Sequence, residues 1–318
     1  MQIDHGSEPV NCCTYDRCIA QLRVSPLEYS ELLGSPVLDD HLASDDPLRL
    51  VVVEGGGDIP APGSLPFVLV ATEPAPNADV VTDRPDLIPK SLAAVTLVTL
   101  LRASDEVAVD VALALESAAY SLLQGSADFD AHEPLTDVGP TVLIDRDRDE
   151  LRVTLNRPDR HNAITAQLRD ELCAALELAR VDDSIERVVL DGAGPSFCSG
   201  GDLAEFGARA DPAAAHLIRL TRSPARLIHR LADRVEVRIH GQTLGGGIEM
   251  AAFAGRVVAA PDTRIALPEV ALGLIPGAGG TVSLPRRIGR QRTAWLALTG
   301  DTIDAPTALD WGLIDAIA

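Results

Sequence analysis

Apolar and polar positions alternate most regularly in the second half of the chain. From Thr141, the segments TVLID and LRVTLN flank the charged turn RDRDE, and this pattern predicts a β-hairpin. Short strands are expected at 187–192 (RVVLDG) and 235–241 (VEVRIHG), with a helix between them over roughly 212–232. Thr165 can cap an earlier helix, whose apolar residues fall on one face: Leu168, Leu172, Ala175, Leu176 and Ala179. The alternation predicts a sheet layered with helices.

The first part of the chain, residues 1 to about 137, is richer in proline and acidic residues. Two apolar, β-branched runs within it, LRLVVVEG (48–55) and PFVLVAT (66–72), predict buried strands. From Ser91 to Gln124 the pattern changes to that of long helices. The stretch SADFDAHEPLTDVGP (126–140) then has the composition of a linker.

The charge balance restricts the possible partners. The 318 residues carry a formal net charge of −20, which argues against general affinity for nucleic acid or for an anionic membrane. An anionic ligand would therefore need local arginines, and LPRRIGRQR (284–292) supplies a cluster of them. No apolar run reaches the roughly 18 residues of a membrane span, and the start of the chain lacks the features of a signal peptide.

The cysteines predict a reduced, cytoplasmic protein. There are five, an odd and small number for a chain of this size: Cys12, Cys13, Cys18, Cys173 and Cys198. The stretch CCTYDRC lacks the CxxC pair or nearby histidines that would complete a four-ligand metal set. We expect no metal there, and we expect Cys198 to be a small buried side chain rather than a reactive thiol.

Two glycine turns and one acid are the candidates for chemistry. The turns are FCSGGDL (197–203) and LGGGIEM (244–250), each between a strand and a helix. Two backbone N–H groups from such turns can converge on one oxygen as an oxyanion hole, or the glycines can simply serve tight turns with positive φ. Glu269 follows a proline in an apolar stretch, where it is either a solvated loop residue or a buried carboxyl with a perturbed pKa.

Five segments together resemble the enoyl-CoA hydratase/isomerase family, the crotonase superfamily. They occur in the family's order, and the resemblance covers about residues 141–318. It implies an α/β fold, a ClpP/crotonase-like spiral core of ββα units. The segments are LNRPDRHNAIT (155–165), FCSGGDL, GQTLGGGIEMA (241–251), LPEVALGLIPGAGGT (267–281) and LTGDTIDAPTALDWGLID (298–315).

The resemblance implies roles for particular residues. Hydratases of the family use two glutamates, at positions matched here by Glu249 and Glu269, whereas many isomerases keep only one. The glycines leave room for a thioester carbonyl, which would accept from the N–H groups of Ser199 and Gly246. The substrate-binding residues implied are Ser199, Gly200, Gly201, Asp202 and Gly246.

The acid pair therefore implies an enoyl-CoA hydratase, a lyase that adds water across the 2,3 double bond of an acyl-CoA thioester. The alternatives are an isomerase or an acyl-CoA hydrolase on the same scaffold, or a non-catalytic member that serves acyl-CoA binding or assembly. No metal or redox cofactor is implied, and coenzyme A enters as part of the substrate. The expected protein is a cytoplasmic homotrimer or dimer of trimers of fatty acid metabolism, with no nucleic-acid or membrane partner.

The chain also departs from the family's pattern. Strand VEVRIHG is less apolar than its usual counterpart, and members usually continue beyond the position of Ala318 with helices that cover the active site. We divide the chain into an N-terminal α/β extension, 1–137, and a catalytic core, 138–318. The stretch LESAAYSLLQGSADF (115–129) is loosely similar to the covering helices. Two helices within 91–129, with a break near Ser104–Asp105, are expected to replace them; a tethered independent domain is the alternative.

Overall fold

The structure is a computed structural model, and the residues it describes are 2–3, 21–43, 49–103, 107–126, 139–205 and 211–318. Three features of the sequence analysis lie outside these residues: the stretch containing Cys12, Cys13 and Cys18, most of the predicted linker, and the predicted break at 104–106.

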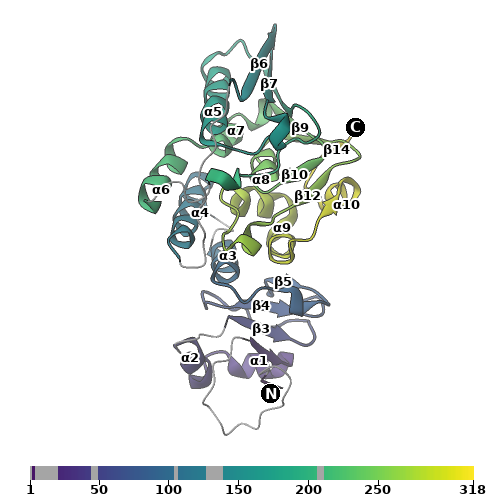
Figure 1. Cartoon of the computed structure of the whole chain (residues 1–318). Coiled ribbons are helices and arrows are strands. Elements are labelled where there is room, and N and C mark those ends of the chain that lie inside the picture. The colour runs from purple at the N-terminus through teal and green to yellow at the C-terminus, as the bar shows by residue number, and fades with distance from the viewer. Residues whose placement is uncertain (1, 4–20, 44–48, 104–106, 127–138, 206–210) are drawn as a thin grey trace.

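A six-stranded sheet forms the centre of the second half of the chain (Figure 1). Its order is β14-β11-β9-β8-β7-β6, and all neighbours are parallel except β6 and β7, which form the predicted hairpin. Its strands are β6 (Val142–Asp147), β7 (Glu150–Leu155), β8 (Arg187–Gly192), β9 (Val235–Ile239), β11 (Arg256–Ala259) and β14 (Ala316–Ile317). A smaller sheet has the order β10-β12-β13, from β10 (Gln242–Leu244), β12 (Arg264–Ala266) and β13 (Ile303–Asp304).

Six α-helices accompany these two sheets within the described part of 139–318. The first confirms its prediction, since Thr165 caps it by accepting from the N–H of Leu168 and all five predicted core residues are buried. The helices are α5 (Ala166–Val181), α6 (Pro212–Thr221), α7 (Pro224–Arg230), α8 (Gly246–Ala251), α9 (Gly280–Thr299) and α10 (Ala305–Trp311).

The prediction of a single helix over 212–232 is wrong. The segment forms two helices, α6 and α7, which are separated at Arg222 and Ser223. Ser223 caps α7 by accepting from the N–H of Arg226, and Pro224 occupies the first turn. Proline lacks the N–H that would continue α6, and it suits the first position of a new helix.

The N-terminal residues form a third sheet, of order β1-β2-β3-β4-β5, at the lower end of Figure 1. The strands are β1 (Gln2–Ile3), β2 (Gln21–Val24), β3 (Leu50–Val53), β4 (Val68–Ala71) and β5 (Val80–Val81). The helices of this region are α1 (Pro26–Leu32), α2 (Pro36–Leu42), α3 (Leu92–Ala103) and α4 (Val109–Gln124). Strands β3 and β4 confirm the two predicted apolar strands, and every residue of both is buried.

Strands β3 and β4 face two different hydrophobic cores. Alternate residues, such as Leu50 and Val52, join the large core that also contains α3, α4 and α9. The residues between them, such as Val51 and Val53, join a smaller core with residues of α1 and α2. Burial on both faces explains why these strands read as continuous apolar runs rather than as alternating ones.

Helices α3 and α4 pack directly on the second half of the chain. Helix α3 lies against α9, and α4 lies against α6 and α9 (Figure 1). Polar contacts reinforce this packing, because the side chain of Gln291 on α9 donates to the carbonyls of Ala75 and Ala78 at 2.7 and 2.9 Å. A buried ion pair between Arg102 and Asp79 ties α3 to the N-terminal sheet. The large core is therefore continuous from α3 and α4 into residues 139–318.

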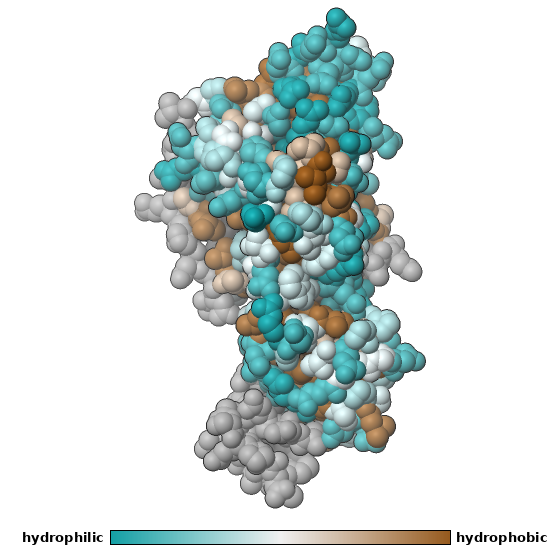
Figure 2. Space-filling model, turned by 90° about the vertical axis from the view of Figure 1, so that its right-hand side faces the viewer, coloured by the Kyte–Doolittle hydropathy of each residue, from teal (hydrophilic) through white to brown (hydrophobic). Residues whose placement is uncertain are grey.

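Polar residues predominate on the face of the molecule in Figure 2, where apolar residues gather in small, separate patches. No helix in the described part of the chain combines the length and the apolar character that a membrane crossing requires.

Candidate active site

The triple glycine joins β10 to α8: Gly245 precedes the helix, and Gly246 and Gly247 are its first two residues. The glycines are needed for different reasons. Gly245 has φ +46°, and a Cβ there would lie 2.1 Å from Oε1 of Glu269. A Cβ on Gly247 would lie 2.5 Å from the carbonyl oxygen of Cys198. The first glycine thus gives room to an acid, and the last allows close packing against the neighbouring turn.

The two glycine turns meet at one cavity of about 550 Å³. A Cβ built on Gly200 would lie 3.6 Å from the amide nitrogen of Gly246, so the turns lie side by side. Gly201 and Gly246 both line the cavity. Neither N–H has an acceptor among the residues that the structure describes. Two unpaired N–H groups at one cavity are what an oxyanion hole requires.

The assignment of Ser199 to this pair of donors is wrong. Its N–H donates to the carbonyl of His161 at 2.9 Å, so it is not free to bind a ligand. Ser199 and Gly200 are also absent from the cavity wall, whereas Gly201 and Asp202 belong to it. The available donor is therefore the N–H of Gly201, two residues further along the same turn.

The two predicted acids reach the same cavity from different elements. Glu249 lies on α8, and its Oε2 accepts from the N–H groups of Ala278 at 2.7 Å and Gly280 at 2.8 Å. Glu269 begins the short 3-10 helix η5 (Glu269–Leu272) and is 7% exposed, so it is not a solvated loop residue. Its Oε2 is buried and has no partner among the described residues. This unpaired oxygen is a group that a bound water or substrate can satisfy.

Burial makes both acids hold their protons unusually strongly. It raises the pKa of Glu249 well above its ordinary value, and the charge of Glu269 raises that pKa further. Burial also raises the pKa of Glu269 to about 7. The two carboxyl groups thus raise the free-energy cost of ionising both at once, since each is buried and a charge on one disfavours a charge on the other. Such a pair can serve as one acid and one base.

A third buried carboxyl group, that of Glu116 on α4, was missed by the sequence analysis. Its oxygens accept from the N–H of Gly279 at 2.8 Å and from the N–H and hydroxyl of Thr281 at 2.9 and 2.7 Å. Burial and then repulsion from Glu249 raise the pKa of Glu116 to about 8, against these hydrogen bonds. The available signal in the sequence was an acid within the apolar helix LALESAAY.

Other polar residues near the site are committed to structural contacts. Asp202 lines the cavity, but its carboxylate accepts from the N–H of Ala204 at 3.1 Å and pairs with the buried Arg157 at 3.0 Å, so it serves as a structural cap. Cys198 is buried, and burial raises the pKa of its thiol to about 12. The part of the chain that the structure describes contains no group of three His, Cys, Asp or Glu residues that could hold a metal ion.

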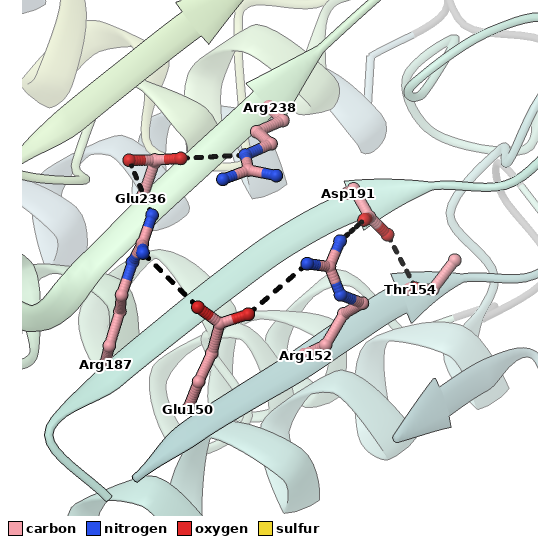
Figure 3. Close-up of polar contacts among 7 residues, drawn as sticks. All are labelled: Glu150, Arg152, Thr154, Arg187, Asp191, Glu236 and Arg238. Atoms are coloured by element: carbon pink, nitrogen blue, oxygen red, sulfur yellow. Dashed lines mark hydrogen bonds and ion pairs between the residues drawn. The ribbon is translucent and has the colours of Figure 1, made fainter. Parts of the chain in front are cut away.

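A second, larger hollow of about 750 Å³ lies on the outer face of the six-stranded sheet. Figure 3 shows that charged side chains in and beside this hollow pair with one another: Glu236 binds Arg187 and Arg238, and Arg152 binds Glu150 and Asp191. This network explains the polar residues of strand VEVRIHG, since Glu236 and Arg238 belong to it. Because its charges are paired within the protein, this face is a weaker candidate for chemistry than the glycine-turn cavity.

Comparison with known proteins agrees with this geometry. The family model described as "Enoyl-CoA hydratase/isomerase" matches residues 150–318, more than half of the chain. The chain belongs to the enoyl-CoA hydratase/isomerase family. The family fold is confirmed by an enoyl-CoA hydratase from Thermoplasma volcanium GSS1. That crystal structure matches at a TM-score of 0.53 and 33% identity, over 57% of this chain and 72% of that one.

Relatives within the family include both hydratases and isomerases. Mevalonyl-coenzyme A hydratase of Beauveria bassiana is 38% identical over 175 residues, which are 52% of this chain and 62% of that protein. The 1,2-epoxyphenylacetyl-CoA isomerase of Escherichia coli is 34% identical over 177 residues, 54% of this chain and 68% of that protein. The chain thus spans less than two thirds of the length of some of the curated relatives it matches.

Removal of the Glu116 carboxyl is predicted to change how stability depends on pH. Between about pH 4.5 and pH 8 the unfolded chain loses a proton that folded Glu116 keeps, so this residue lowers the stability of the fold as pH rises. Glu116→Gln lacks this effect. The free energy of unfolding of the variant, relative to the wild type, should therefore increase from pH 5 to pH 8 in denaturant titrations. Glu177→Gln, on the exposed side of α5, is the control. A difference between Glu116→Gln and wild type that stays constant across this range contradicts the assignment.

Proposed function

We propose that the protein is an enoyl-CoA hydratase, which adds water across the 2,3 double bond of an acyl-CoA thioester. The observation that carries the proposal is the meeting of Glu249 and Glu269 with the free N–H groups of Gly201 and Gly246 at one cavity. Acids with raised pKa values beside preorganised donors suit proton transfer coupled to formation of an enolate.

In the proposed reaction, the thioester carbonyl accepts from the N–H groups of Gly201 and Gly246. A water molecule lies between the two carboxyl groups. The carboxylate takes one proton from this water while its oxygen bonds to C3, and the π electrons move toward the thioester as an enolate. The protonated acid then gives its proton to C2. One proton enters the pair and one leaves it, so the pair returns to its starting protonation state.

The main alternative is an isomerase, which moves a double bond by proton transfer alone. The family contains such enzymes, and one of the similar proteins is named as an isomerase. A hydrolase or a non-catalytic acyl-CoA-binding member is a further alternative. The two buried acids in one cavity wall favour a catalytic member, because a binding or assembly module gains nothing from the free-energy cost of burying them.

We also propose that α3 and α4 serve as the covering helices of the acyl pocket. Tyr120 and Gln124 of α4 line the cavity, and a Cβ on Gly277 would lie 2.3 Å from the Tyr120 ring. In this view residues 1–137 are an extension that completes the core of 138–318. The proposal further includes a trimer or dimer of trimers, a cytoplasmic location, a role in fatty acid metabolism, and catalysis without a metal or redox cofactor.

The direct test of the proposed reaction is loss of enone absorbance when purified protein meets a panel of trans-2-enoyl-CoA thioesters. Glu249→Gln and Glu269→Gln should each lower turnover by about 10²- to 10⁴-fold, the usual contribution of a general acid or base. Binding of saturated acyl-CoA should change little. If Glu269→Gln hydrates at the wild-type rate while Glu249→Gln does not hydrate at all, the two-acid mechanism is wrong and a mechanism of the isomerase type takes its place.

Backbone substitutions test the oxyanion hole. Gly246→Pro and Gly201→Pro each remove one of the two proposed N–H donors and should abolish hydration. Ser199→Ala keeps its N–H, which donates to His161, and should leave turnover near the wild-type value. Circular dichroism establishes whether each proline variant keeps its fold. If folded Gly201→Pro keeps wild-type turnover while Ser199→Ala is severely impaired, the donor assignment made here is incorrect.

A further inference from the structure

The glycine-turn cavity adjoins a smaller one of about 100 Å³, called the side cavity below. The two share Ile164, Arg169 and Arg219 in their walls, together with Gly277 and Ala278. Glu249 and Glu269 line only the larger one. Because the two cavities share part of their walls, the side cavity is next to the place where the reacting carbons would lie.

Three arginines line this side cavity, an unusual wall for an acyl pocket in a chain of net charge −20. Arg169 of α5 and Arg222, just after α6, share one carboxylate, that of Asp170. Arg219 of α6 has no carboxylate within ion-pair distance among the described residues. The remaining acid in the wall is Glu116, whose oxygens are occupied by Gly279 and Thr281. Positive charge is thus in local excess.

Arg219 is fixed in place before any ligand binds. Its Nε donates to the hydroxyl of Ser117 at 3.0 Å, and Nη2 donates to the hydroxyl of Ser121. Nη1 donates to Oε1 of Gln124 at a long 3.3 Å, and the guanidinium stacks over the Tyr120 ring at 4.8 Å. Nη2 also donates to the carbonyl of Ser117 at 3.3 Å. Together these contacts use four of the five guanidinium N–H groups and leave one N–H of Nη1, and none of them neutralises the charge. A partly buried cation held by neutral partners favours an anionic ligand.

We propose that the side cavity binds the far end of the acyl group and that this end carries a carboxylate. The substrates would then be coenzyme A thioesters of unsaturated dicarboxylic acids, with Arg219 and Arg169 as the residues that determine specificity. This inference rests on the proposed function for the reaction, but the binding preference does not depend on turnover. The volume of the side cavity favours a short chain, since it holds only a few heavy atoms beyond the reacting carbons.

The test compares ligands that differ only at the far end of the acyl group. Calorimetry on the full-length protein measures the dissociation constants of glutaryl-CoA and adipyl-CoA against those of valeryl-CoA and hexanoyl-CoA. The carboxylated member of each pair should bind about tenfold tighter or more, as expected for a charge-assisted contact. Arg219→Met and Arg169→Met should each bring this ratio close to one. Arg180→Met, an exposed arginine of α5, should leave the ratio unchanged.

The ratio of the two dissociation constants distinguishes loss of the positive charge from collapse of the pocket, because a collapsed pocket weakens the binding of both ligands alike. Equal binding of the paired ligands by the wild type, or a wild-type ratio in both arginine variants, overturns the inference. Hydration assays with the matching enoyl-CoA pairs separate it from the proposed function. Hydration with no preference for the carboxylated substrate refutes this inference alone. A binding preference without any hydration supports it and refutes the proposed reaction.

Discussion

Two buried carboxyl groups bind the amino-terminal end of α9, and the rest of the site depends on this arrangement. The first N–H groups of a helix have no acceptor within the helix, and they attract negative charge. Glu249 accepts from Ala278 and Gly280, and Glu116 accepts from Gly279 and Thr281. Successive amides thus alternate between an acid from α8 and an acid from α4. The loop before α9 is thus held from two helices at once.

This arrangement joins residues that are far apart in the sequence into one site. Glu249 is oriented by the loop, and the loop is held in turn by Glu116 of the N-terminal region. Helix α4 also brings Tyr120 and Gln124 to the cavity wall. The same two residues hold Arg219 in the wall of the side cavity. The free energy that buries Glu116 comes from the same apolar core that joins α3 and α4 to α9. Helix α4 therefore contributes both to the packing of the apolar core and to the wall of the cavity.

The sequence predicted what depends on local pattern and on the family's motifs. The hairpin, the capped helix α5 and the buried strands β3 and β4 follow from periodicity and capping, which act within a few residues. The catalytic acids and the glycine turns follow from motif order. The sequence did not predict which amide of FCSGGDL is free, because this depends on the carbonyl of His161 from another loop. Glu116 and Arg219 were missed because their roles come from contacts between α4, α6 and α9.

The most direct test of this account is a comparison of the full chain with a chain shortened to residues 139–318, which lacks α3 and α4. Without them the loop before α9 loses its Glu116 contacts, and a large apolar surface of the core is exposed to water. The rate of trans-2-enoyl-CoA hydration is measured for both chains, together with their oligomeric state in solution. The account predicts that the shortened chain aggregates or, if it stays soluble, does not hydrate the substrate. A shortened chain that stays soluble, keeps the oligomeric state of the full chain and hydrates at its rate would show that the N-terminal region is only an accessory domain.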